Sequence, residues 1–352
     1  MDSEFIYIKD SKLKECINEA LGKGLCKKTI SSKDMECLTE LSIKSADISN
    51  IDGLQYAVNL EKLDLTDNKI EDISALKNLA NLKSLILSEN NIEDIFSIIN
   101  LINIEELDLS NNKIKDISCI KKLTNLVDLN LSDNNLENIV FVRKLKSLKK
   151  LILMNNKIED IKPLEGLTNL ESLVLANNKV VNISPIKDLK KLELLNFNNN
   201  NIKDIKPVKN LKNLKGFYFE NNDISDISAI KDLKFIKYLS LNSNNIEDVS
   251  YLKDLNELFT IHLNDNRIKD ISMLGHLKHI NRAIIYDQIV PVQALANINI
   301  RDVNGAVLEV KSIKSNSLKN ITSNEVVLAT FESPENMFTG KIILSLNLKQ
   351  RY

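Results

Sequence analysis

Apolar residues recur along most of this chain with a period of 22 residues. The first full unit places them at Leu60, Leu63, Leu65, Ile70 and Ile73, and the same columns stay apolar in the units that follow. Such self-similarity is typical of a solenoid, in which each unit packs only against its neighbours. The alternation at Leu63 and Leu65 predicts a short strand, so successive units form one parallel sheet. The three-residue apolar spacing that begins at Ile70 predicts a return by 3₁₀ or irregular turns.

An asparagine stands at one fixed place in each of these units. These residues are Asn68, Asn90, Asn112, Asn134, Asn156, Asn178, Asn200, Asn222, Asn244 and Asn266. The chain turns inward there, and buried backbone groups need partners that an amide side chain supplies as both donor and acceptor. We therefore predict a structural ladder of amides that satisfies the turn of each repeat and the next.

Atypical segments flank the repeats, as the apolar ends of a solenoid require. Residues 1–58 predict a helical cap, with one helix after Asp10 and Ser11, a second from Ser32 to Leu38, and then a degenerate first repeat. Residues 59–280 hold the ten regular repeats. In residues 281–352 the composition changes, and this part predicts a small β-sandwich-like cap with strands at 326–331 and 341–348.

The repeat core Asn-x-Ile-x-Asp-Ile, as in Asn112-Lys113-Ile114-Lys115-Asp116-Ile117, and the order of the three parts resemble the internalin family of bacterial leucine-rich-repeat proteins. Tyr286-Asp287-Gln288 resembles the family's junction, and the segments 302–305 and 338–340 resemble its C-terminal domain. The resemblance implies a leucine-rich-repeat solenoid of the α/β class, a right-handed horseshoe with a parallel concave sheet and a 3₁₀ or irregular convex side. It also implies an immunoglobulin-like C-terminal cap.

The predicted concave columns, which begin at Lys62, Asp64, Thr66 and Asp67, change character along the chain. The first four repeats are acidic there. In later repeats the candidate partner-binding residues are Ile152, Met154, Val174, Leu194, Tyr218, Tyr238 and His262. Exposed aliphatic and aromatic side chains on a sheet favour a protein-binding surface, with Tyr218 and Tyr238 as anchors. The alternative is that these side chains only pack against their cross-strand neighbours.

Composition narrows the function classes. Three histidines, no nucleophile motif and no glycine-rich phosphate loop predict that the chain is not an enzyme, and no residue pattern indicates a cofactor or a metal. A net charge of -1 argues against nucleic-acid binding, and no apolar run is long enough for membrane insertion. We therefore expect a monomeric protein-interaction module. The alternatives are a surface adhesin that binds receptors and a cytoplasmic regulatory subunit of an enzyme such as a phosphatase.

The chain's beginning bears on location. No basic region followed by an apolar run opens the sequence, which predicts a cytoplasmic protein, or a secreted or cell-surface one if Met1 is not the native start. The cysteines Cys16, Cys26, Cys37 and Cys119 show no paired spacing. They predict buried free thiols, with one disulfide within the cap as the alternative for an exported protein.

Overall fold

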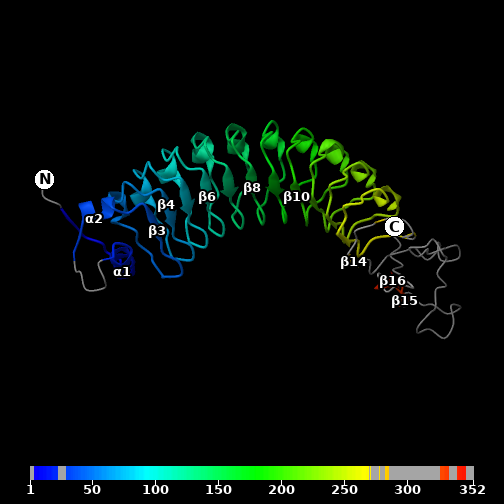
Figure 1. The fold of residues 1–352 in the computed structure, drawn as a ribbon, viewed down its shortest axis with the longest axis horizontal. Coiled ribbons are helices and arrows are strands. Elements are labelled where there is room, and N and C mark those ends of the chain that lie inside the picture. Colours follow the sequence, from blue (N-terminus) through cyan, green and yellow to red (C-terminus); the bar gives the residue numbers. More distant parts are fainter. Residues whose placement is uncertain are drawn as a thin grey trace, which may run out of the picture. The chain divides into compact units, whose positions relative to one another are not determined.

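The computed structural model describes residues 4–22, 29–268, 270, 277, 282–284, 326–332 and 339–345. It comprises two compact units, Met1–Asn178 and Lys179–Tyr352. Figure 1 shows the repeats of each unit as successive coils, each with one short strand and one return segment.

Within each unit, the strands of the repeats pair in parallel and in sequence order. In the first unit they are β3 (Glu40–Ser42), β4 (Lys62–Asp64), β5 (Ser84–Ile86), β6 (Glu106–Asp108), β7 (Asp128–Asn130), β8 (Lys150–Ile152) and β9 (Ser172–Val174). In the second they are β10 (Leu194–Asn196), β11 (Gly216–Tyr218), β12 (Tyr238–Ser240), β13 (Thr260–His262) and β14 (Arg282–Ile284). Leu63 pairs with Leu85, a register shift of one repeat, so equivalent side chains stack in columns.

The return segments are 3₁₀ helices, as the apolar spacing predicts. They are η1 (Leu54–Tyr56), η2 (Ser74–Leu76), η3 (Phe96–Ile98), η4 (Ser118–Lys122), η5 (Val140–Lys144), η6 (Lys162–Leu164), η7 (Ser184–Ile186), η8 (Lys206–Asn210), η9 (Ser228–Ile230) and η10 (Ser250–Leu252). The aspartate of the repeat core starts most of these turns: Asp72 Oδ1 accepts the Ser74 backbone N–H at 2.7 Å, and Asp94 and Asp116 repeat this contact. The recurrent aspartate is therefore a turn-starting group.

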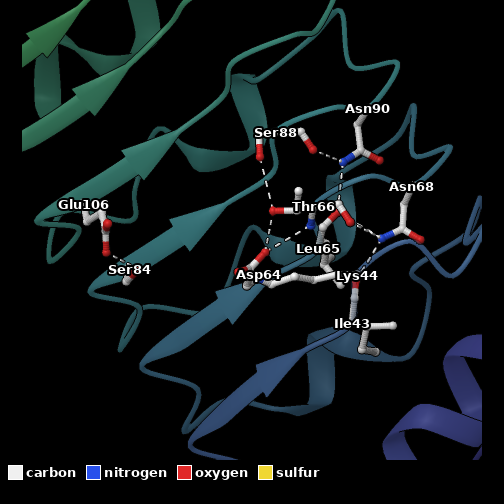
Figure 2. A network of polar contacts seen from close by, with 10 residues as sticks. All are labelled: Ile43, Lys44, Asp64, Leu65, Thr66, Asn68, Ser84, Ser88, Asn90 and Glu106. Carbon is white, nitrogen blue, oxygen red and sulfur yellow. Dashed lines mark hydrogen bonds and ion pairs between the residues drawn. The ribbon is translucent and has the colours of Figure 1, made fainter.

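The asparagine column lies between strand and return, buried in every repeat. Asn90 Nδ2 donates to Leu65 O and Leu87 O at 3.0 and 3.2 Å, while its Oδ1 accepts the Ile70 N–H at 3.0 Å. Figure 2 shows Asn68 making the equivalent contacts with Ile43 and Leu65. Each amide thus bonds its own repeat and the preceding one, whereas the sequence analysis expected the following one.

A second asparagine column, on the other side of the strand, was not foreseen. Asn81 Nδ2 donates to Val58 O at 2.9 Å, and Asn59, Asn103, Asn125, Asn169 and Asn213 make the same bond to the carbonyl 23 residues earlier. These residues have the same 22-residue spacing as the buried column, which is the signal that could have revealed them. They differ in being exposed to solvent, except for Asn169, which is half-buried.

The residue before each buried asparagine takes a left-handed backbone conformation. Asp67 has φ of 56°, and the same column continues through Glu89, Asn111, Asp133, Asn155, Asn177, Asn199, Asn221, Ser243 and Asp265. Asn and Asp tolerate this region better than most residues, which explains their frequency here. In the sequence this column is seen only as part of the predicted concave surface, and its backbone requirement becomes visible in the structure.

The N-terminal segment contains the two helices expected there. They are α1 (Ser11–Ala20) and α2 (Ser32–Glu36), and a short antiparallel pair joins β1 (Phe5–Ile6) to β2 (Ile30–Ser31). Asp10 caps α1 by accepting the Leu13 N–H at 3.1 Å, and it also accepts the Ser49 N–H of the degenerate repeat at 3.1 Å. One side chain therefore ties the helix to the repeats.

Asp47 provides a second link. Lys12 of α1 and Lys69 of the next repeat both bond its carboxylate, at 3.0 and 2.9 Å. The hydrogen bonds from Lys69 and Lys12 lower the pKa of Asp47 to about 2.

The C-terminal strands are β15 (Val326–Glu332) and β16 (Thr339–Ser345), which pair antiparallel close to the predicted positions. Most of the predicted immunoglobulin-like cap, including the segment 302–305, and the junction-like residues 286–288 lie outside the described residues.

The thiols are only partly as expected. Cys119 is a buried free cysteine, whereas Cys16 is half-buried and Cys37 is exposed, so the prediction of burial was wrong for Cys37. Burial, followed by the charge of Asp116, raises the pKa of Cys119 to about 11. Cys26 lies outside the described residues.

Candidate functional site

The solvent-facing side chains of the strands form the surface that the sequence predicts to be concave, here called the outer face. Its columns begin at Lys62, Asp64 and Thr66, and they alternate with the buried Leu63 and Leu65. Strand pleating fixes this alternation, because successive side chains point to opposite sides of a sheet.

In the first unit, polar side chains on and beside β4 to β7 form a hydrogen-bonded network on the outer face. Asp64 accepts from Lys44 Nζ at 2.7 Å and from Thr66 Oγ1 at 2.6 Å, and Thr66 Oγ1 lies 3.2 Å from Ser88 Oγ (Figure 2). Burial alone would raise the pKa of Asp64, but the bonds from Lys44 and Thr66 outweigh it and lower that pKa. Ser84 Oγ donates to Glu106 at 2.6 Å in the same view.

Two further acidic residues of this face, Asp108 and Asp128, are also engaged. Asp108 accepts from Ser110 Oγ at 2.6 Å and from Asn130 Nδ2 at 3.0 Å, and Lys150 pairs with Asp128 at 2.9 Å. Lys44 and Lys150 thus neutralise part of the negative charge that the sequence predicts for the first four repeats. Among the described residues no group of three acidic, cysteine or histidine side chains is arranged to hold a metal ion.

The aliphatic candidates of the first unit lie on the outer face as half-buried side chains. Ile152 pairs in register with Val174 on the neighbouring strand, and Met154 follows β8 on the same side. These three side chains form a modest apolar area.

In the second unit the candidates group around a glycine. Leu194, Gly216 and Tyr238 are cross-strand neighbours in one column, and Tyr218 stands two residues after the glycine on β11. A Cβ on Gly216 would lie 3.0 Å from Tyr218 Cε2 and 3.6 Å from Leu194 Cγ, so the tyrosine ring fills the space left by the missing side chain. Burial, followed by the nearby Tyr238, raises the pKa of the Tyr218 phenol.

Phe259 extends this group and was not foreseen. Its ring meets that of Tyr238 edge-on, with centroids 6.4 Å apart. It stands in a column otherwise occupied mostly by lysine and glutamate, where Lys215 and Glu193 form an ion pair at 2.7 Å. A phenylalanine in a charged column was the available signal.

We call Leu194, Tyr218, Tyr238 and Phe259 the aromatic strip. Tyr238 and Phe259 remain 45% and 44% exposed, whereas Tyr218 is half-buried. Polar groups border the strip: Ser240 Oγ donates to Glu220, and Asn242 Oδ1 accepts the Asn264 N–H at 2.8 Å. His262 lies in the same column as Tyr218, with Ser240 between them.

Comparison with known families identifies the repeats. The family described as Leucine Rich repeats (2 copies) matches overlapping segments from residues 58–100 to residues 212–256. None of the curated proteins compared with the chain matches it. Within the described residues, no helix is long and apolar enough to cross a membrane.

Solved structures extend the comparison. An internalin, InlF of Listeria monocytogenes, is 31% identical with a TM-score of 0.70, over 83% of this chain and 94% of its own. A leucine-rich-repeat protein of Leptospira interrogans is 25% identical with a TM-score of 0.70, over 76% of this chain and 70% of its own. The ectodomain of an Arabidopsis thaliana receptor kinase, at 21% identity and a TM-score of 0.57, covers 75% of this chain and 38% of its own and shares the fold. The chain belongs to the leucine-rich-repeat family, and within it to the internalin-like proteins.

Proposed function

We propose that this chain binds a protein partner on the outer face of its sheet, with the aromatic strip as the anchor. The repeats and their structural relatives support a protein-interaction module in general. The observation that carries the finer proposal is the exposure of Tyr238 and Phe259 at positions where the fold needs no apolar side chain.

The first unit provides the internal comparison. Its equivalent columns hold polar residues that bond polar partners: Ser84 donates to Glu106, and Asp64 accepts from Thr66. The same strand geometry therefore forms with polar residues, so strand packing alone does not account for the aromatic strip.

The chemistry of the strip suits protein recognition. Tyrosine and phenylalanine offer large rigid contact area with few rotatable bonds, and binding anchors are often enriched in tyrosine. The surrounding Glu220, Ser240 and Asn242 supply the polar rim that typically surrounds such an anchor.

The relatives are consistent with this use of the fold. The Arabidopsis receptor ectodomain was solved in complex with Casparian strip integrity factor 2. A regulatory subunit would meet its partner inside the producing cell, whereas a surface adhesin would meet it on a foreign cell. Both sources therefore belong in the test.

The test is affinity capture from two pools, a lysate of the producing cells and a preparation of foreign cell-surface proteins. We expect one pool to yield a protein that binds the wild type but is lost with Tyr218→Ala combined with Tyr238→Ala. Tyr251→Ala is the matched control, because Tyr251 lies in η10 on the return side. Equal capture by the double variant and the control, with both folded by circular dichroism, would remove the aromatic strip from consideration.

A further inference from the structure

The return side of the first unit has a hollow of about 580 Å³ between η4 and η5. A smaller hollow beside it shares Lys115, Asp116 and Ser118 with the first. It adds Phe96 and Cys119 together with the charged side chains of Glu93, Asp94 and Lys113. We call the two together the return-side groove. It lies on the opposite side of the repeats from the outer face.

Two exposed apolar side chains stand at the groove. Phe96 is 64% exposed and Val140 is 51% exposed. Phe141, which follows Val140, is only 7% exposed and lines the larger hollow. The column of Phe96 and Val140 holds serine or lysine in the other returns, including Ser74, Ser118, Lys162, Ser184, Lys206, Ser228 and Ser250. The fold therefore does not require these two apolar residues.

The charge of the larger hollow is strongly positive. Its lining carries four cations, Lys115, Lys121, Arg143 and Lys144, against the single carboxylate of Asp116. No described carboxylate forms an ion pair with any of the four.

One substitution in the repeat pattern adds to this charge. The turn-starting aspartate becomes Asn138 here, and its Oδ1 still accepts the Val140 N–H at 2.8 Å. The turn is kept while one negative charge is absent from the hollow.

We propose that the return-side groove binds an acidic peptide segment of a protein partner. Apolar side chains of that segment pack on Phe96, Val140 and Phe141, and its carboxylates face Arg143 and the lysines. The complementary charges would speed association and fix the orientation of the bound peptide. Exposed apolar residues beside the cations favour a peptide over a nucleic-acid backbone, which has charge but few apolar groups. This surface does not depend on the aromatic strip.

The probe is a short labelled peptide that alternates glutamate with leucine and phenylalanine, measured by fluorescence anisotropy at low ionic strength. A matched peptide with lysine in place of glutamate and a single-stranded oligothymidine serve as comparison probes. We expect the acidic peptide to bind, and Arg143→Glu combined with Lys144→Glu to weaken its binding about tenfold or more. Val140→Ser should weaken it as well, by loss of apolar contact.

Lys209→Glu combined with Lys231→Glu is the charge-matched control, because these residues occupy the position of Arg143 in two later repeats. It should bind the acidic peptide as the wild type does, and all variants should keep the wild-type melting temperature. The proposal is overturned if the acidic peptide does not bind, if both double variants weaken it equally, or if the oligothymidine binds in its place. It is also overturned if the chain dimerises through this groove, seen as a dimer in sedimentation that Arg143→Glu with Lys144→Glu abolishes.

Discussion

Replacing Asn112 by leucine removes one rung of the buried asparagine ladder. The amide donates to Leu87 O, Leu109 O and Ser110 O at 3.0, 3.2 and 3.1 Å, and it accepts the Ile92 N–H at 2.9 Å. Leucine has nearly the same size but offers no hydrogen bond.

The cost follows from which groups lose their partners. Leu87 O and Leu109 O each keep a second donor, Asn90 or Asn134, because each of these two carbonyls accepts from two successive rungs. The Ile92 N–H has only the amide oxygen. One buried unsatisfied donor costs about 1–3 kcal/mol, and the weakened carbonyl contacts add about 1 kcal/mol or more. We expect a loss of about 2–4 kcal/mol after the added apolar burial of leucine is allowed for.

Urea unfolding followed by circular dichroism measures the loss, and hydrogen exchange at the Ile92 amide locates it. Asn125→Leu is the control, because Asn125 is exposed and makes a single bond to Ile102 O at 3.0 Å. It should cost no more than about 1 kcal/mol. If Asn112→Leu is no more destabilising than Asn125→Leu, or if the Ile92 amide stays protected, the ladder is not what satisfies the turn.

Three further predictions test other parts of the structure. Gly216→Ala should displace the Tyr218 ring toward solvent and return the Tyr218 pKa toward its ordinary value, as read by absorbance titration; an unchanged pKa would contradict the packing described. Because the folded pKa of Asp47 is depressed to about 2, its contribution to stability is present above the unfolded pKa of about 3.9 and lost as pH falls toward 2. Amide exchange in α1 should accelerate over that range in the wild type and be less pH-dependent in Asp47→Asn, whereas identical profiles would refute the link. At pH 8 a thiol reagent should modify exposed Cys37 quickly and buried Cys119 only slowly, as mass spectrometry can resolve, and equal rates would show that Cys119 is accessible.

The parts of the fold that repeat were predictable from sequence because each column states the same requirement many times. A single Leu63 could belong to many structures, but a column that stays apolar at every repeat fixes the strand, the core side and the register. The 3₁₀ returns followed from the three-residue apolar spacing that begins at Ile70. The second asparagine column, which begins at Asn59, has the same 22-residue spacing and was predictable for the same reason. The buried asparagine column alone was enough to account for that spacing, so the second column did not stand out.

The candidate sites depend instead on departures from the repeat. Gly216 reads as a weak strand residue until the structure shows the Tyr218 ring above it. Phe259 and Val140 break their columns in sequence, but only the structure shows that one meets Tyr238 and that the other lies beside a hollow. Both contacts depend on the direction of the side chains and on the space between neighbouring repeats. The sequence pattern contains neither kind of information.

The central claim is that a protein partner contacts the outer face at the aromatic strip. The most direct measurement places a photo-crosslinking amino acid at position 238 and, separately, at position 251, and exposes both proteins to the same partner pools. We expect the crosslinker at position 238 to form a covalent adduct with one protein, and the crosslinker at position 251 to form none. Adducts of equal yield from both positions, or an adduct only from position 251, would contradict it.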